Sequence, residues 1–232
     1  MQVRQLFDRE SSTYSYLVFD RGEAALIDPV REQSDRDLDL VRELGLRLTH
    51  VIETHVHADH VTAAGAIRER TGARTAASAA GAPCVDIHLR HGDMIRVGDV
   101  QLTALATPGH TDDGLALSAP GLVFTGDTLL IRGCGRADFQ NGDPGQLYDS
   151  ITRTLFALPD ETLIYPAHDY KGCSVSTIGE ERRLNPRIAG KTRDEFIAIM
   201  TSLDLPPPAK LAESVPANRA CGEMGEDERV AL

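Results

Sequence analysis

The chain has 232 residues, of which 41% are hydrophobic and 25% are charged, values that are ordinary for a soluble globular enzyme. Its formal net charge of -11 argues against nucleic acid and anionic membranes as partners. No apolar run approaches the roughly 18 residues that a membrane span needs, and the N-terminal sequence shows no signal peptide or presequence pattern. We therefore expect a soluble, cytoplasmic protein.

The four cysteines are widely spaced and form no C-x-x-C pair. A chain of this length can build an adequate core without disulfides, so a disulfide scaffold is not expected. A reducing, cytosol-like compartment fits better. The cysteines are Cys84, Cys134, Cys173 and Cys221.

The first third of the chain predicts short strands, separated by turns, and two helices. Asp-Arg-Gly at 20–22 and Asp-Pro at 28–29 are turn signals. Apolar residues at helical spacing lead up to Gly45, and helical character returns before Thr71-Gly72. The expected strands are 2–7, 14–19, 24–27 and 48–53, and the expected helices are 38–44 and 63–70.

The rest of the chain repeats the strand pattern and then becomes helical. Asp143-Pro144 opens a helix, and Thr177-x-x-Glu180 and Thr192-x-x-Glu195 are typical of capping boxes that start two more. The proline-containing tail from about residue 206 is expected to be irregular. Strands followed by helices, twice over, favour two sheets with helices outside them, in a single domain over residues 1–232. The expected strands are 94–97, 100–106, 115–118, 122–124 and 162–165.

The segment Thr54-His55-Val56-His57-Ala58-Asp59-His60 carries four side chains of the metal-ligand type within six residues. Because His55 and His57 are two residues apart at a strand end, both side chains leave an extended backbone on the same side. A lone histidine is more often an ordinary polar residue. Three histidines and an aspartate at one strand end predict a metal site.

Three later turns, each directly after a predicted strand, add further candidates. Pro108-Gly109-His110-Thr111 presents His110, Thr125-Gly126-Asp127-Thr128 presents Asp127, and Pro166-Ala167-His168-Asp169 presents His168. Loops at strand ends commonly carry catalytic groups on a rigid scaffold. Any one of these turns alone is a weak signal, because Gly and Asp are common in turns. Together with the histidine-rich segment they are a strong one.

The motifs THVHADH, PGHT, TGDT and PAHD, in this order, resemble the signature of the metallo-β-lactamase superfamily. The resemblance implies an α/β protein with the four-layer αββα sandwich and a metal site at one edge, between the sheets. Members hydrolyse several kinds of bond or carry out redox chemistry, so the fold does not choose the reaction. The residues implied around the site are His55, His57, Asp59, His60, His110, Asp127 and His168.

The stretch LLIRGCGRADFQ at 129–140 is similar to the persulfide dioxygenase family, as are YPAHDY, LNPR and VPAN further along. That resemblance implies oxidation of glutathione persulfide by O2 to glutathione and sulfite, with one Fe(II) per chain. By the family's pattern, His55, His110 and Asp127 are the iron ligands. This two-histidine, one-carboxylate set leaves coordination positions open.

The number of metal ions stays open at this point. With one iron, His57, Asp59, His60 and His168 are catalytic groups that orient water and the ligands, whereas with two metals they are ligands themselves. The second case corresponds to the alternative function, a dinuclear zinc hydrolase of glutathione thioesters like glyoxalase II. The short chain after His168 leaves little room for the helical C-terminal region of those thioesterases. A complete ligand set argues against a non-catalytic metal-binding protein.

Glutathione carries two carboxylates, so a cationic side chain is expected near the site. Arg136 is the candidate, because a guanidinium donates two hydrogen bonds to a carboxylate. Tyr170 corresponds to a glutathione-contacting tyrosine of the related thioesterases. Cys134 is either a sulfur-handling thiol or a small buried residue of a tight turn. For one of Arg132 and Arg136, a structural ion pair is the favoured interpretation.

The resemblance also suggests partners. Glutathione persulfide and O2 are the expected substrates, and nucleic acid and membranes are not expected. A homodimer and a separate rhodanese-type sulfurtransferase are the further partners that it suggests.

Overall fold

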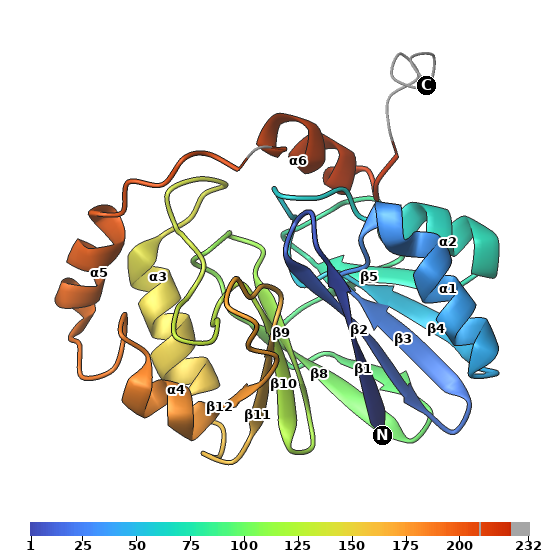
Figure 1. Ribbon diagram of the computed structural model, residues 1–232, viewed down its shortest axis with the longest axis horizontal. Helices are drawn as coiled ribbons and strands as arrows, with labels where there is room; N and C mark the ends of the chain where they lie inside the picture. Colours follow the sequence, from blue (N-terminus) through green and yellow to red (C-terminus); the bar gives the residue numbers. More distant parts are fainter. Residues whose placement is uncertain (209, 224–232) are drawn as a thin grey trace. The chain divides into compact units, whose positions relative to one another are not determined.

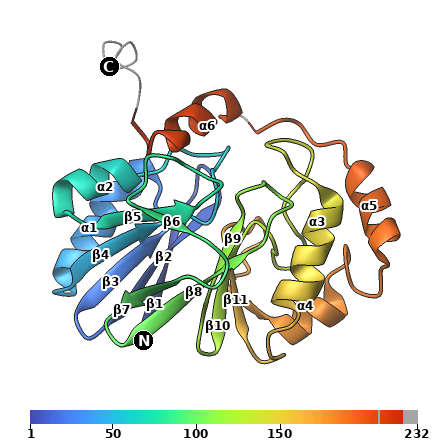
Figure 2. The same cartoon turned by 180° about the vertical axis from the view of Figure 1, so that it is seen from behind.

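A computed structural model of the chain describes residues 1–208 and 210–223, which fall into two compact units. Unit 1 comprises Met1–Leu89, Arg96–Val100 and the chain from Pro207, and unit 2 comprises Arg90–Ile95 and Gln101–Pro206. Each unit is built on one six-stranded mixed sheet with helices beside it (Figures 1 and 2). The stretch Arg96–Val100, which includes a turn between two strands of the second sheet, is grouped with unit 1.

The sheet of unit 1 has the strand order β1-β2-β3-β4-β5-β6. The first three strands form an antiparallel meander, and β4, β5 and β6 then add in parallel to β3. Because β3 and β4 are parallel neighbours, the residues that follow them lie at the same edge of the sheet. The strands are β1 Gln2–Asp8, β2 Thr13–Asp20, β3 Glu23–Ile27, β4 Arg47–Ile52, β5 Arg74–Ser78 and β6 Ile87–Leu89.

Helices α1 (Ser34–Glu43) and α2 (Ala64–Thr71) cover one face of this sheet (Figure 1). Alternate residues of a strand point to the same face, so Leu17 and Phe19 of β2 both reach the helices. They pack in one buried cluster with Leu38 and Val41 of α1 and Ile67 of α2. The expected stop at Thr71-Gly72 is confirmed, because Gly72 ends α2 in the left-handed conformation with φ of 72°.

The sheet of unit 2 has the strand order β12-β11-β10-β9-β8-β7. Strands β10 and β11 are parallel, whereas β8–β9, β9–β10 and β11–β12 are antiparallel pairs. It follows that β8, β10 and β11 run in the same direction and end at the same edge of the sheet. The strands are β7 Met94–Val97, β8 Val100–Ala106, β9 Leu115–Ala119, β10 Leu122–Gly126, β11 Leu163–Pro166 and β12 Ser176–Thr177.

Three helices pack on one face of this sheet. Asp143 caps α3 (Pro144–Asp149) by accepting from the Gln146 backbone N–H, as the Asp-Pro sequence predicts, and a π-helical turn over Ser150–Leu155 continues it. Helices α4 (Ile178–Leu184) and α5 (Arg193–Thr201) complete the layer. The buried cluster beneath them includes Val123, Ile164, Leu147, Ile178 and Phe196.

The capping boxes are confirmed for one helix of the two. Thr192 and Glu195 exchange both hydrogen bonds at the start of α5. At the start of α4, Thr177 accepts from the Glu180 backbone N–H, but the Glu180 carboxylate is bound by Arg132 instead of returning to the cap. An ion pair with Arg132 therefore replaces the hydrogen bond between the Glu180 carboxylate and the backbone N–H of Thr177.

Three features differ from the expectations or lie outside them. Strands β5, β6 and β12 are not among the predicted strands, and residues 211–219, expected to be irregular, form α6 (Leu211–Arg219). Cys84 and Cys221 form a disulfide, although no disulfide scaffold is expected from the sequence. They are far apart in sequence, and only the fold brings them together. The single-domain interpretation stays a prediction.

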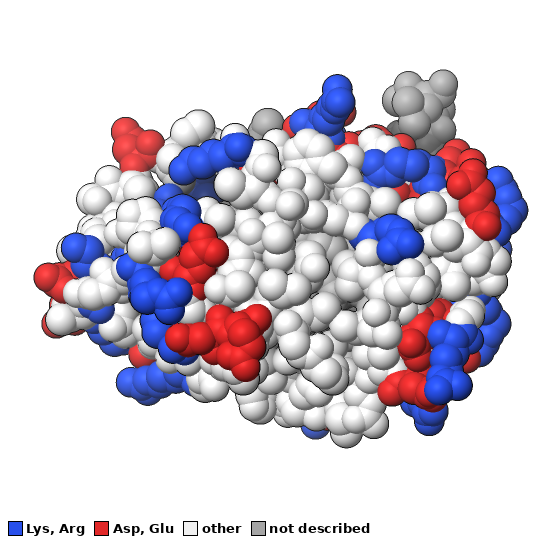
Figure 3. All heavy atoms as spheres, turned by 60° about the horizontal axis from the view of Figure 1, so that its bottom comes forward, with Lys and Arg blue, Asp and Glu red and all other residues white. Residues whose placement is uncertain are grey.

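On the face that Figure 3 shows, positively and negatively charged side chains do not form separate patches. Lys and Arg side chains lie intermingled with Asp and Glu there. Pairs such as Arg42–Asp39 and Arg96–Asp99 join opposite charges that are exposed. Among the described residues, no helix has the length and apolar character needed to cross a bilayer.

Candidate metal centre

The predicted metal segment lies in unit 1, in a stretch without regular structure that follows β4. We call residues 53–63 the ligand loop. Apart from an isolated bridge between Val30 and Thr62, this loop contains no strand or helix. The side chains of His55, His57 and His60 are all buried, with exposed fractions of 5%, 1% and 1%.

A chain of hydrogen bonds fixes the ring of His55. Asp28, which directly follows β3, accepts from both the backbone N–H and the hydroxyl of Thr54, at 2.7 and 2.8 Å. The Thr54 hydroxyl has given its hydrogen to Asp28, so it accepts from Nδ1 of His55 at 3.0 Å. The lone pair of the ring is then on Nε2, the tautomer that a metal ligand needs.

His57 lies between two carboxylates of its own unit. Its Nε2 is 3.2 Å from Oδ1 of Asp28 and 3.4 Å from Oε2 of Glu53. Burial alone lowers the pKa of His57, but the charges of Asp28 and Glu53 outweigh it and raise that pKa well above its ordinary value. The two carboxylates therefore favour the protonated form of the His57 ring.

Asp59 and His60 form a third local group with Thr13 of β2. The Asp59 carboxylate accepts from the Thr13 hydroxyl and from Nδ1 of His60, both at 3.0 Å. Nε2 of His60 is buried and has no hydrogen-bond partner among the described residues. Asp59 thus holds the His60 ring in one orientation.

In unit 2 the three later candidates meet at one edge of the sheet. His110, Asp127 and His168 follow β8, β10 and β11, which end at that edge. Nε2 of His110 is 3.5 Å from Oδ2 of Asp127, and Nε2 of His168 is 3.7 Å from Oδ1 of the same residue. Parallel-running strands thus bring together residues that are up to 58 positions apart.

The backbone orients His110. The carbonyl of Arg136 can only accept, so Nδ1 of His110 donates to it, at 2.6 Å, and the ring's lone pair is on Nε2. The neighbouring Gly135 donates from its N–H to the Asp127 carbonyl at 2.7 Å. The backbone of Gly135 and Arg136, at the end of the Gly-Cys-Gly turn, therefore contacts two of the candidate ligands.

The donor set fits a metal ion. Buried polar atoms are nearly always hydrogen-bonded, yet Nδ1 of His57, Nε2 of His60 and Oδ1 of Asp127 have no hydrogen-bond partner among the described residues. Imidazole nitrogens together with a carboxylate suit iron, zinc and related transition metals. These unsatisfied atoms and the two fixed tautomers are what a metal-binding site requires.

The arginines near the turn are engaged in ion pairs. Arg136 binds Asp138 through two hydrogen bonds of 2.6 Å and also donates to the carbonyls of Leu205 and Pro206. Arg132 binds Glu180 and the buried Glu181. Both Arg132 and Arg136 therefore form structural ion pairs, whereas the sequence favours such a pair for one of the two.

Tyr170 and Cys134 are placed differently from each other. The Tyr170 side chain is 73% exposed, and its ring stacks on that of His168 at a centroid distance of 6.0 Å. Cys134 is buried beside Met200 and Arg187, and burial raises the pKa of its thiol to about 11. A neutral, enclosed thiol favours the structural interpretation of Cys134.

Three residues of the ligand-loop surroundings lie outside the predictions. Asp28 directly follows one predicted strand and Glu53 ends another, and parallel pairing of those strands was the signal that could have placed them together. Asn218, in α6, donates to the carbonyls of His57 and His60. It belongs to the VPAN motif, but nothing in that motif indicates its contacts.

Comparison with known proteins defines the class. The family model described as "Metallo-beta-lactamase superfamily" matches residues 8–83 and 85–168. The chain therefore belongs to the metallo-β-lactamase superfamily, which confirms the predicted α/β fold class.

Within the superfamily the chain belongs to the persulfide dioxygenase family. It is 47% identical over 225 residues to human "Persulfide dioxygenase ETHE1, mitochondrial", a match that covers 95% of this chain and 88% of the human protein. The crystal structure of ETHE1 from Myxococcus xanthus is 61% identical, with a TM-score of 0.95, and the match covers 96% of this chain and all of that one. A hydroxyacylglutathione hydrolase from Cereibacter sphaeroides is 41% identical over 69% of this chain and 64% of its own length.

Proposed function

We propose that the protein is an iron-dependent persulfide dioxygenase, which converts glutathione persulfide, O2 and water into glutathione and sulfite. The observation that carries this proposal is the match to persulfide dioxygenases, which runs through 95% of the chain and so through both units. The match to the glutathione thioester hydrolase is shorter and covers 69% of the chain.

The proposed iron ligands are His55, His110 and Asp127. The two tautomers support this choice, because each ring carries its lone pair on Nε2. Iron(II) held by two histidines and one carboxylate would supply the one-electron chemistry with O2 that zinc lacks. We expect one iron per chain.

His57, Asp59, His60 and His168 are proposed as catalytic groups that orient the ligands and water. Nε2 of His57 lies against Asp28 and Glu53, so two carboxylates hold the orientation of this ring. Asp59 holds His60, and His168 lies beside the proposed ligand Asp127. These four side chains hold protons and fix ring orientations around the reacting sulfur.

Arg136, Tyr170 and Cys134 remain the proposed substrate-binding residues. The large exposed surface of Tyr170, stacked on His168, supports contact with a glutathione backbone. For Arg136 to bind a glutathione carboxylate, its guanidinium has to share or exchange Asp138. Cys134 contributes as a packed neutral thiol in the turn beside His110.

The alternative function is a dinuclear zinc hydrolase of glutathione thioesters. The hydroxyacylglutathione hydrolase match favours it, and so does the presence of all seven ligand-type residues.

A cytoplasmic location, a homodimer and a separate rhodanese-type sulfurtransferase complete the proposal of a persulfide dioxygenase. The mammalian relatives are named as mitochondrial proteins.

Metal analysis combined with O2 uptake tests the proposal. Protein produced without added metal should contain about one iron per chain and consume O2 with glutathione persulfide. His110→Ala and Asp127→Ala should each lose the iron and the O2 uptake. Two zinc ions per chain, with thioester hydrolysis and no O2 uptake, would establish the alternative instead.

A further inference from the structure

One amide side chain of α6 satisfies three backbone groups of the ligand loop. Asn218 accepts from the N–H of Thr62 at 2.8 Å and donates to the carbonyls of His57 and His60 at 2.9 and 2.8 Å. Its side chain is buried, with an exposed fraction of 4%. An asparagine amide has two donor hydrogens and one acceptor oxygen, so all of its groups serve this loop.

These bonds take the place of regular secondary structure. Buried backbone groups need partners, and the ligand loop has no ladder or helix to provide them at these positions. Since the carbonyls held are those of His57 and His60, Asn218 fixes the backbone of the ligand loop just after the proposed ligand His55. Loss of the amide leaves two buried carbonyls and one N–H unsatisfied, at a cost that the loop can reduce only by moving.

The helix that carries Asn218 is weak by itself. Helix α6 has nine residues, contains Pro216 and has no side-chain cap at its start. Helices this short are marginal in water, and an interior proline removes one hydrogen bond of the helix. The position of Asn218 therefore depends on contacts made by the residues around it.

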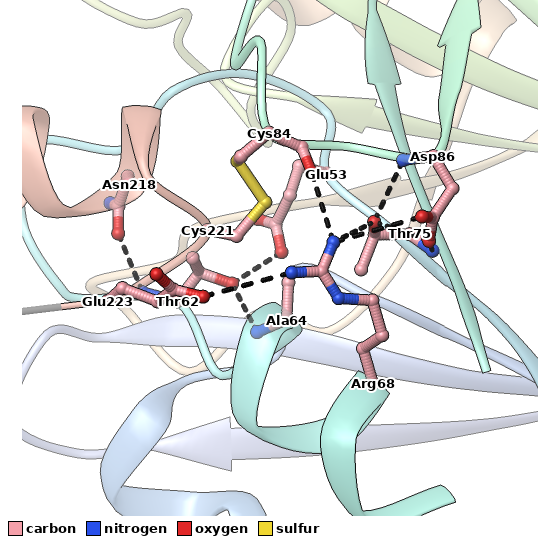
Figure 4. The surroundings of a disulfide bond; sticks show 10 residues. All are labelled: Glu53, Thr62, Ala64, Arg68, Thr75, Cys84, Asp86, Asn218, Cys221 and Glu223. Carbon is pink, nitrogen blue, oxygen red and sulfur yellow. Dashed lines mark hydrogen bonds and ion pairs between the residues drawn. A yellow bond between two sulfur atoms is a disulfide. The ribbon is translucent and has the colours of Figure 1, made fainter. Parts of the chain in front are cut away.

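The disulfide supplies the covalent contact (Figure 4). Cys221 is three residues after Asn218, donates from its N–H to the Asn218 carbonyl and is bonded to Cys84. The Cys221 carbonyl also accepts from the N–H of Gly65 in α2 at 2.8 Å. A Cβ on Gly65 would lie 2.6 Å from that carbonyl oxygen, so the close approach requires glycine.

Two further hydrogen bonds lie in the region around the disulfide and the ligand loop. Arg68 of α2 donates to the Cys84 carbonyl at 3.0 Å, and Thr62 donates from its hydroxyl to Glu53 (Figure 4). Glu53 in turn faces His57. The disulfide, the amide and the His57 environment thus form one connected set of contacts within unit 1.

We propose that Asn218 is a positioning residue of the ligand loop and that the Cys84–Cys221 disulfide holds it there, so that reducing this disulfide weakens metal retention. This rests on the proposed function in taking the ligand loop as part of an iron site. The reductant is a low-molecular-weight thiol. Two such thiols supply two electrons and two protons, the Cys84–Cys221 bond becomes two protein thiols, and the small thiols join in a disulfide of their own.

The amide is tested by iron retention against a competing chelator under anaerobic conditions, measured as iron per folded chain. Asn218→Ala and Asn218→Asp should bind iron about 10 to 100 times more weakly, the range typical of residues that orient metal ligands. Ser214→Ala is the matched control in the same helix, because that buried hydroxyl has no hydrogen-bond partner among the described residues. It should retain iron like the wild type.

The disulfide is tested on the wild type and on Cys84→Ser/Cys221→Ser. Treatment with a dithiol should lower the iron affinity of the wild type several-fold and leave the double variant, already weaker, unchanged. Cys173→Ser, which removes the exposed free cysteine, should respond to the dithiol as the wild type does.

Wild-type iron retention in folded Asn218→Ala or Asn218→Asp would overturn the positioning role. Equal retention in the oxidised and reduced wild type would overturn the role of the disulfide. If both Asn218 variants fail to fold, the dithiol titration of the unmutated protein decides the proposal. O2 uptake with glutathione persulfide is a separate measurement, so the proposed function and this inference can fail independently.

Discussion

The ring of His110 is held by the main chain of Arg136, through a hydrogen bond of 2.6 Å from Nδ1 to the Arg136 carbonyl. The residue before it, Gly135, lies so close to the ring that a Cβ there would be 2.7 Å from His110 Nδ1 and 2.6 Å from the Asp127 carbonyl oxygen. Two proposed iron ligands are therefore positioned by the backbone of one turn.

Gly135→Ala should displace His110 and lower both iron content and stability. Overpacking of this kind typically costs about 1–3 kcal/mol, and the displaced ring no longer directs Nε2 at the metal. Iron per chain and Tm are the measurements. Gly133→Ala is the matched control, since its Cβ would meet only the Leu130 Cβ at 3.9 Å. Normal iron content in folded Gly135→Ala would show that the turn does not position the ligands.

Arg136→Ala should raise KM for glutathione persulfide and leave iron content unchanged. The bond to His110 uses the Arg136 carbonyl, which the substitution keeps, whereas the guanidinium is the proposed carboxylate partner. Loss of a charge-assisted hydrogen bond corresponds to about a tenfold rise in KM. Arg132→Ala, which breaks the pairs with Glu180 and Glu181, should lower Tm without this effect on KM. An unchanged KM in Arg136→Ala would remove Arg136 from the substrate site.

Cys134 should resist alkylation in the folded protein. Burial raises the pKa of its thiol to about 11, so the reactive thiolate is scarce near pH 8, and the surrounding side chains exclude the reagent. Mass spectrometry of native, unreduced protein treated with iodoacetamide should show one adduct, at the exposed Cys173. Reduction and denaturation should release four reactive cysteines. Rapid native modification of Cys134 would contradict the enclosed environment.

Asp37→Asn should stabilise the protein at neutral pH. Burial of Asp37 raises the pKa of its carboxyl more than the neighbouring Arg36 lowers it, and one carboxylate oxygen has no hydrogen-bond partner among the described residues. Because the folded-state pKa is the higher one, the folded state binds the proton more tightly, and the wild type regains relative stability as pH falls. The Tm advantage of the variant should therefore shrink as pH approaches the ordinary carboxyl pKa of 3.8. An advantage that does not change between pH 7 and pH 4 would show that the charge is not its cause.

Sequence patterns predict most of the fold because most elements carry a local signal. Alternating apolar residues mark β2, and Asp143-Pro144 marks the start of α3. Strand β5, Arg74–Ser78, has two alanines and no alternation, since three of its residues are buried. Such a strand is defined by its parallel neighbours and cannot be recognised from its own composition.

The candidate site likewise contains some residues that the sequence reveals and others that only the fold reveals. His55, His110 and Asp127 are visible in sequence because histidine and aspartate at strand ends are chemically distinctive. Asn218 and the partner of Cys221 are not, because their roles come from contacts across more than 130 residues of sequence. The capping residue Glu180 shows the opposite limit, where a local motif is present and a distant arginine takes its carboxylate.

The Asn218 contacts also set an order of events during synthesis. A ribosome that has just added His60 must add 158 more residues before the amide that binds its carbonyl exists. At about 5–20 residues per second, this takes roughly 8 to 30 seconds. Throughout that interval the carbonyls of His57 and His60 lack their partner Asn218. We therefore expect stable metal binding only after α6 has emerged from the ribosome.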